Sequence, residues 1–222
     1  VDVHMSDIAS CSEDLSSFDG LAVCGGFSYG DVLGAGQGWA SSITHVPHVR
    51  EVFSNFFLRK NTFTLGVCNG CQMLSLLKDI IPGAEFWPSF HENKSGQFEA
   101  RLTMVEVTQS PSIFLGELSG LRAPIVVSHG EGRVINPPEN KNLVCLRYID
   151  NFGNVTQTYP SNPNGSELGI TGLTSSDGRV TIMMPHPERV FLKKQLSWSP
   201  KSWINDESPW MEMFDAARRK VK

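Results

Sequence analysis

Residues 63–77 of the chain read FTLGVCNGCQMLSLL. The stretch begins as a short apolar run, and its later apolar residues Met73, Leu74 and Leu77 follow helical spacing. This pattern predicts a buried strand, an abrupt turn and a helix, with Cys68 on the turn.

Gly66 and Gly70 stand two residues before and two residues after Cys68. A strand that turns directly into a helix strains the residue at its tip, and side chains two positions away would collide. The pattern Gly-x-Cys-x-Gly therefore predicts a nucleophile elbow, which holds the Cys68 sulfur exposed at the carboxyl edge of a sheet. The positive end of the following helix favours a thiolate at that position.

Other uses of the cysteines remain alternatives at this point. Cys68 could be a small buried apolar residue, as free cysteines often are. Cys68 and Cys71 also spell C-x-x-C before a helix, which fits a thioredoxin-like dithiol with Cys71 one helical turn beyond Cys68 and on the same face. A zinc site would require a second close pair of ligands, but Cys11, Cys24 and Cys145 are scattered singly. We therefore predict no metal.

Length and composition limit the class of protein. The chain has 222 residues, a net charge of −4 and five irregularly spaced cysteines. The length suits one α/β domain, and we expect residues 1–222 to form a single domain taken from a longer protein. The acidic balance argues against nucleic acid as a partner, and no apolar run is long enough to cross a membrane. The cysteine pattern favours a reducing compartment, by default the cytoplasm.

Alternating and helical patterns predict the remaining elements. We expect an α/β fold with an open, mostly parallel twisted sheet that is flanked by helices, and an antiparallel hairpin around Asp177-Gly178. Strands are predicted at residues 1–5, 21–24, 98–107, 123–127, 142–150, 170–174 and 180–184, and helices at residues 46–60 and 209–221.

A glycine-rich loop at residues 25–38 follows the strand at residues 21–24. Such a loop can hold phosphate, but no Gly-Lys-Ser/Thr follows it, and Trp39 stands where a dinucleotide fingerprint would need glycine. Paired glycines just after a strand can instead aim a backbone N–H into the same crevice that Cys68 occupies, as an oxyanion hole requires.

The hairpin leads into Met-Pro-His-Pro-Glu-Arg at residues 184–189. Pro187 favours an extended conformation for His186, and residues two apart on an extended chain project to the same side. We therefore expect His186 and Glu188 to form a pair. A cysteine nucleophile, a histidine base and a carboxylate that orients the base form a triad for acyl transfer.

Five stretches of the chain carry a resemblance to a known family. They read GGFSYGDVLGAG (25–36), GVCNGCQ (66–72), SHGEGR (128–133), NPNGS (162–166) and MPHPERVF (184–191). With them the chain resembles the class I glutamine amidotransferases, and among these the carboxy-terminal glutaminase domain of the long, single-chain phosphoribosylformylglycinamidine synthases. Gln37 and Leu192 depart from the Glu and Arg usual in that family.

The resemblance implies a reaction. Cys68 would attack the side-chain amide of glutamine, and His186 would protonate the departing ammonia and then activate the water that releases glutamate. Glu188 would fix the imidazole. The ammonia would pass to an ATP-dependent synthetase site that makes formylglycinamidine ribonucleotide in purine biosynthesis.

The resemblance also implies roles for residues around the triad. The backbone N–H groups of Gly26 and Asn69 would hold the oxyanion, and Gln72, Ser128 and His129 would bind the amino-acid end of glutamine.

The partner implied by the resemblance is a synthetase portion of the same polypeptide, which would hold ATP and Mg²⁺, with no cofactor in this chain. A strand and a helix would precede residue 1. Trp198, Trp203 and Trp210 are candidates for the docking face, or they pack against their own domain. A binding protein on the same fold without glutaminase activity is the alternative function, and it would not need the pair of His186 and Glu188.

Overall fold

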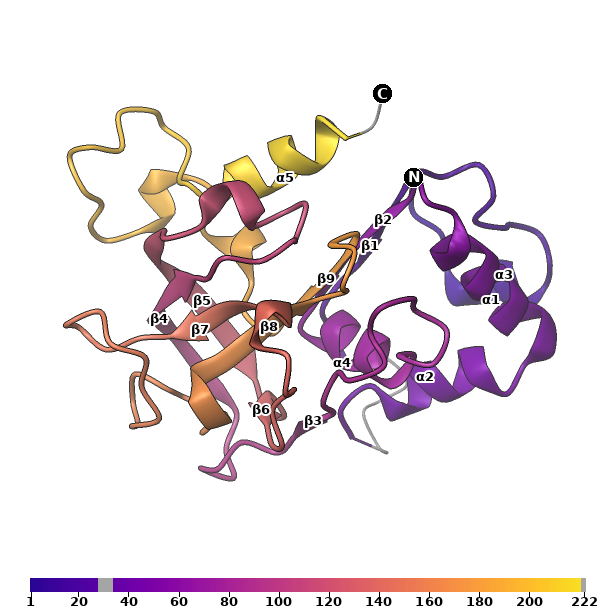
Figure 1. Ribbon diagram of the computed structural model, residues 1–222, viewed down its shortest axis with the longest axis horizontal. Helices are drawn as coiled ribbons and strands as arrows, with labels where there is room; N and C mark the ends of the chain where they lie inside the picture. The colour runs from indigo at the N-terminus through magenta and orange to yellow at the C-terminus, as the bar shows by residue number, and fades with distance from the viewer. Residues whose placement is uncertain (28–33, 221–222) are drawn as a thin grey trace.

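The computed structural model of the protein describes residues 1–27 and 34–220. Seven strands form one curled sheet at its centre (Figure 1). The strands are β1 (Gly20–Val23), β2 (Phe63–Val67), β3 (Phe90–His91), β4 (Glu99–Val107), β5 (Arg122–His129), β6 (Arg133–Val134), β7 (Val144–Tyr148), β8 (Ile170–Thr174) and β9 (Val180–Met183). The helices are α1 (Met5–Ala9), α2 (Gln37–Thr44), α3 (Pro47–Leu58), α4 (Asn69–Leu76) and α5 (Met211–Arg218). These elements confirm the predicted α/β class.

The strand order in the main sheet is β1-β2-β9-β8-β7-β4-β5, and β3 and β6 form a separate antiparallel pair. The expected parallel pairing holds at one end of the sheet, where β1 pairs with β2 and β2 with β9. The other described neighbours in the main sheet are antiparallel. Parallel pairing requires long crossovers, whereas the second half of the chain connects its strands more directly.

The parallel end of the sheet carries most of the helices. In Figure 1, α1 to α4 gather on one side of β1, β2 and β9, and α5 lies on the other side. Helix α3 buries its apolar face through Val49, Phe53, Phe56 and Phe57, as the spacing predicts. The sheet and these helices share one hydrophobic core.

The start of the chain differs from its prediction. Residues 1–5 were expected to form a strand, but Met5 begins α1. The His4 side chain accepts a hydrogen bond from the Ser6 backbone N–H, and the His4 backbone N–H donates to the Asp7 carboxylate. This reciprocal capping starts a helix where apolar alternation alone suggests a strand.

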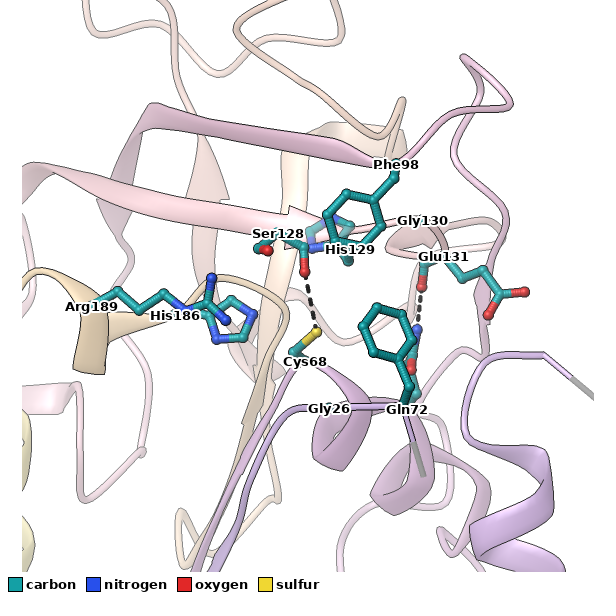
Figure 2. A pocket seen from close by; sticks show the side chains of 11 residues that line it. Gly26, Cys68, Gln72, Phe98, Ser128, His129, Gly130, Glu131, His186 and Arg189 are labelled. Atoms are coloured by element: carbon teal, nitrogen blue, oxygen red, sulfur yellow. Dashed lines mark hydrogen bonds between the residues drawn. The ribbon is translucent and has the colours of Figure 1, made fainter. Parts of the chain in front are cut away.

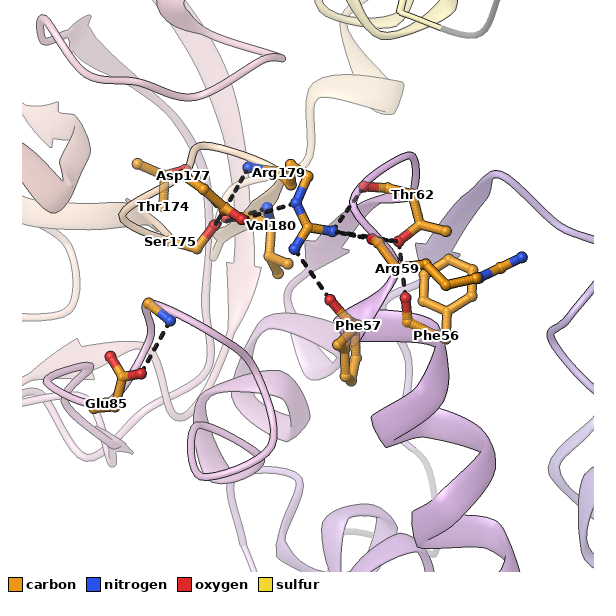
Figure 3. Close-up of polar contacts among 11 residues, drawn as sticks. Phe56, Phe57, Arg59, Thr62, Glu85, Thr174, Ser175, Asp177, Arg179 and Val180 are labelled. Carbon is orange, nitrogen blue, oxygen red and sulfur yellow. Dashed lines mark hydrogen bonds and ion pairs between the residues drawn. The ribbon is translucent and has the colours of Figure 1, made fainter.

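The predicted hairpin of β8 and β9 is confirmed, and it also fastens α3 (Figure 3). Arg179 follows the turn, and its guanidinium donates to the backbone oxygens of Phe57 and Arg59, at 3.0 and 2.7 Å, where α3 ends. Asp177 holds the other side of that guanidinium at 2.8 Å. A cation at the carboxyl end of a helix complements the helix dipole and satisfies its last carbonyls.

The tail tryptophans do not form one exposed face. Trp210 is fully buried, and its indole N–H donates to the backbone oxygen of Pro124 at 2.8 Å. Trp203 is partly buried against the core. Trp198 alone among the three is largely exposed, at 73%. The predicted helix at residues 209–221 is observed as α5, and residue 221 lies outside the described part of the chain.

Candidate active site

Cys68 occupies the predicted elbow between β2 and α4, with φ 53° and ψ −111°. A side chain at Gly66 would come within 2.5 Å of Leu74, and one at Gly70 within 2.1 Å of the Val23 backbone oxygen. Both glycines are therefore required for the close approach of strand and helix, which confirms the steric argument for the elbow.

The elbow does not leave the sulfur as open as expected. Cys68 is 7% exposed, whereas Cys11 and Cys24 are exposed on the surface. The Cys68 thiol instead lines a pocket of about 290 Å³ and donates a hydrogen bond to the Ser128 backbone oxygen at 3.6 Å. Access to this sulfur is through the pocket.

His186 reaches the same pocket from the segment after β9. A side chain at Gly25 would meet the His186 ring at 2.9 Å and the Cys68 Cβ at 3.1 Å, so the imidazole and the cysteine lie against the same glycine. Parallel pairing explains this meeting. The carboxyl ends of β1, β2 and β9 share one edge of the sheet, and Gly25, Cys68 and His186 follow these strands.

Glu188 accepts a hydrogen bond from, or shares a proton with, Nδ1 of His186 at 2.6 Å. The predicted pair is present, but the backbone route differs. His186 is extended, as its proline neighbour requires, while residues Pro187–Arg189 form a 3₁₀ turn that brings the carboxylate back to the ring. His186 is buried and the Glu188 side chain is about half exposed.

The surroundings of His186 favour its protonated form. Burial by itself lowers the pKa of this imidazole, but the Cys68 thiol and the Glu188 carboxylate together raise the pKa to about 9. For Glu188, burial raises the pKa, but the hydrogen bond and charge of His186, with smaller contributions from the backbone and Arg189, together lower the pKa. His186 therefore carries a proton at neutral pH, and the ring can deliver it to a leaving group.

The pocket wall contains most of the residues that the sequence singled out (Figure 2). Gly26 lines it with φ 146°, a conformation that suits glycine, and Asn69 opens α4 beside Cys68. Gln72, Ser128 and His129 also line the pocket. The Gln72 amide donates to the Glu131 backbone oxygen at 2.6 Å. Part of the motif at residues 25–36, including Gly30, lies outside the described residues.

Five pocket residues had no predicted role: Phe27, Phe98, Gly130, Glu131 and Arg189. The rings of Phe27 and Phe98 lie 6.1 Å apart between their centroids, although they belong to distant parts of the chain. Glu131 accepts a hydrogen bond from the Ala35 backbone N–H at 2.5 Å. Local sequence carries no signal for these contacts, although all of these residues except Phe98 lie within the quoted motifs.

The environment of Cys71 opposes the dithiol alternative. Cys71 is fully buried, and burial raises its thiol pKa, which opposes a reactive dithiol with Cys68. No group of three potential metal ligands occurs among residues 1–27 and 34–220. In that same part of the chain, no helix is long and apolar enough to span a membrane.

Comparison with known proteins finds one matching family and several structures with a similar fold. The family model of the CobB/CobQ-like glutamine amidotransferase domain matches residues 1–221. The structure of PurLQS from Thermotoga maritima is similar with a TM-score of 0.68 and 23% identity, over 95% of this chain and 83% of that chain. A protein assigned as a GMP synthase subunit from Thermoplasma acidophilum has a TM-score of 0.51 and 17% identity, over 97% of this chain and 77% of its own. These two structures share the fold.

Proposed function

Because the chain belongs to the CobB/CobQ-like glutamine amidotransferase family, we propose that Cys68, His186 and Glu188 form the triad that hydrolyses the side-chain amide of glutamine. The observation that carries this proposal is the convergence of Cys68 and His186 on Gly25 inside one pocket, with Glu188 bonded to the far side of the imidazole.

The proposed reaction follows from these positions. Cys68 attacks the amide carbon as a thiolate, with its proton held by His186, and the backbone N–H groups of Gly26 and Asn69 stabilise the negative oxygen that develops. The His186 proton passes to the nitrogen, so that ammonia leaves and a γ-glutamyl thioester remains on Cys68. His186, now neutral, takes a proton from water, which attacks the thioester and releases glutamate. Glu188 keeps the imidazole oriented through both steps.

Glutamine would lie along the wall formed by Gln72, Ser128 and His129, with its amide at Cys68. The pocket volume of about 290 Å³ is at the lower end of the range for small-molecule sites, which suits an amino acid. No cofactor is needed for this hydrolysis.

We further propose that the ammonia serves a phosphoribosylformylglycinamidine synthase, which converts formylglycinamide ribonucleotide to formylglycinamidine ribonucleotide with ATP and Mg²⁺ in a synthetase portion of the same polypeptide. The five motifs at residues 25–36, 66–72, 128–133, 162–166 and 184–191 support this assignment. Such an enzyme acts in the cytoplasm.

A glutaminase assay with matched variants tests the proposal. Cys68→Ala and His186→Ala should each lower glutamate release by at least about a thousandfold, while Glu188→Ala should leave a measurable remainder because the carboxylate only orients the base. Cys71→Ala is the control and should retain activity. Full activity of Cys68→Ala would refute the triad. Transfer of labelled amide nitrogen from glutamine to formylglycinamide ribonucleotide, by the chain joined to its synthetase, tests the second step.

A further inference from the structure

The Asn-Pro-Asn-Gly-Ser stretch at residues 162–166 has no role in the proposed chemistry, yet its polar side chains are buried. Asn164 is fully buried, and its side chain contacts the pocket residue His129. The Asn164 side-chain nitrogen lies 3.3 Å from Nε2 of His129, 2.7 Å from the Gly132 backbone oxygen and 3.2 Å from the Tyr148 hydroxyl. Asn164 therefore joins the loop after β5 to the core.

Backbone groups fix which end of the Asn164 amide faces His129. The amide oxygen accepts the Ser166 backbone N–H at 3.0 Å, and the amide nitrogen donates to the Gly132 backbone oxygen. If the amide were flipped, its oxygen would face the Gly132 oxygen and its NH₂ group would face the Ser166 N–H. Both contacts would be repulsive, so the atom that meets His129 is a donor.

The orientation of Asn164 determines the proton position on His129. The amide has two hydrogens, one for the Gly132 oxygen and one shared between the Tyr148 hydroxyl and Nε2 of His129, so a hydrogen on Nε2 would face the amide NH₂ group. Nε2 is therefore unprotonated, and a neutral ring carries its hydrogen on Nδ1. The ring is neutral because burial and the nearby His186 lower its pKa to about 3. The Tyr148 hydroxyl behind Asn164 also stays neutral, since burial raises its pKa.

The Nδ1 atom of His129 is buried and has no hydrogen-bond partner among the described residues. Nε2 of His186 is the other such atom among the residues that line the pocket. A buried N–H without a partner costs about 1–3 kcal/mol, so a partner supplied by a ligand is favoured. The proposed reaction uses Nε2 of His186, but it provides no hydrogen-bond partner for Nδ1 of His129.

The loop that follows His129 leaves space for the imidazole and is itself held by hydrogen bonds. A side chain at Gly132 would come within 2.2 Å of Nε2 of His129, so the second glycine of the Ser-His-Gly-Glu-Gly-Arg motif leaves space for the imidazole. Asn93 holds the same loop from the other side. Its amide donates to the His129 backbone oxygen at 2.8 Å and accepts the Gly132 N–H at 3.0 Å.

We propose that Asn164 is a positioning residue that keeps the proton of His129 on Nδ1, and that this N–H donates a hydrogen bond to glutamine at the pocket wall. The second clause rests on the proposed glutaminase function, whereas the first does not. The substrate carboxylate and amide oxygens are the acceptors that such a donor would recognise.

Nitrogen NMR of the chain with ¹⁵N-labelled histidine determines the proton position directly, with His129 assigned from the spectrum of a His129→Gln variant. We expect protonated Nδ1 and unprotonated Nε2 in the wild type, and titration of glutamine into Cys68→Ala should shift the Nδ1 signal. Protonated Nε2 in the wild type would overturn the role of Asn164, and this measurement needs no Asn164 variant to fold.

Kinetics supply a second test with a matched control. Asn164→Ala should raise the KM for glutamine about tenfold, the loss expected for one hydrogen bond, with a smaller change in kcat. Asn162 is equally buried and makes four hydrogen bonds to the segment around it, at Thr156, Gly165 and Ser166, so Asn162→Ala should lose stability without this change in KM. Equal KM values for the two variants would overturn the inference. If the wild type hydrolysed no glutamine, the proposed function would fail, while the NMR measurement would still test Asn164.

Discussion

Cys68 is held in a backbone conformation that non-glycine residues rarely adopt, with φ 53°. Strain of this kind persists where the surroundings fix it, and here Gly66, Gly70 and the hydrogen bond from the Cys68 N–H to the Met183 oxygen at 2.9 Å do so. The strained position places Cys68 on the wall of the pocket that His186 also lines, while Cys71, on the next turn, is fully buried. The two thiols of one C-x-x-C pattern therefore have different environments.

We expect the pH dependence of the proposed hydrolysis to follow the His186 and Glu188 pair. The pKa of His186 is raised to about 9, so the imidazole is protonated below that pH and loses its proton as the pH rises through it. Activity that needs this proton should fall above about pH 9. Glu188→Gln removes a carboxylate that raises the His186 pKa, so the alkaline limb of kcat/KM should move to lower pH.

The pH profile of wild type and Glu188→Gln, measured with glutamine over both limbs, checks this expectation. An unchanged alkaline limb in the variant would show that Glu188 does not set the proton affinity of His186. His129 should contribute no limb near neutral pH, because its pKa is about 3.

The turn at residues 34–36, before α2, is held by the carboxylate of Glu131, which is distant in the sequence. Gly34, Ala35 and Gly36 all have positive φ, which is unfavourable for Ala35. Glu131 accepts the Ala35 N–H at 2.5 Å, and its backbone oxygen receives the Gln72 amide. One residue thus links the turn to the proposed glutamine-binding wall.

Glu131→Ala should release this turn and lower kcat/KM about tenfold, since a hydrogen bond to a charged group contributes about 1.5–3 kcal/mol. Glu131→Gln keeps an acceptor oxygen and should retain most of the activity. Amide exchange at Ala35 provides the direct measurement and should be faster in Glu131→Ala than in Glu131→Gln. Equal exchange in both variants would contradict the assigned contact.

The hydrogen bonds of Arg179 that join the β8–β9 hairpin to α3 should contribute to the free energy of unfolding (Figure 3). Arg179→Ala removes several hydrogen bonds to the carbonyls at the end of α3, and we expect it to lower the free energy of unfolding by about 2–4 kcal/mol. Arg122→Ala is the control, because its pair with Glu106 is exposed and should contribute about 0–1 kcal/mol. Urea denaturation measures both, and similar losses would argue against this contribution.

Local sequence predicted the elements whose cause is local. The elbow follows from two glycines around Cys68, the hairpin from Asp177-Gly178, and the pairing of His186 with Glu188 from their spacing, although a 3₁₀ turn brings the pair together. The contacts of Asn164 and Glu131 join segments that are far apart in the sequence, so no local pattern predicts them. The capping of α1 overrode an apolar alternation that resembles a strand.

At the scale of the whole molecule, the pocket is assembled from segments that lie far apart in the sequence. Parallel strands place Gly25, Cys68 and His186 at one edge, and antiparallel β5 brings Ser128 and His129 to the same place, where Val126 bridges to His186. The predicted sheet was mostly parallel, but the observed mixed sheet serves the site through both kinds of pairing.

We expect the isolated chain to hydrolyse glutamine slowly and to gain activity when joined to a synthetase with its substrates bound. Ammonia released without an acceptor is lost, so completion of the site by the partner is useful. Gly26, which carries one of the proposed oxyanion N–H groups, is exposed and can change conformation. The comparison is the glutaminase rate of the chain alone and joined, with and without synthetase substrates. A full rate in the isolated chain would exclude this coupling.

We propose above that Cys68 is the nucleophile for glutamine. The most direct test is mass mapping after treatment with a glutamine analogue that carries an electrophilic carbon in place of the amide nitrogen. We predict a single adduct on Cys68 that excess glutamine prevents, although Cys11 and Cys24 are more exposed. An adduct on Cys71, or labelling of Cys11 and Cys24 with none on Cys68, would show that Cys68 is not the nucleophile.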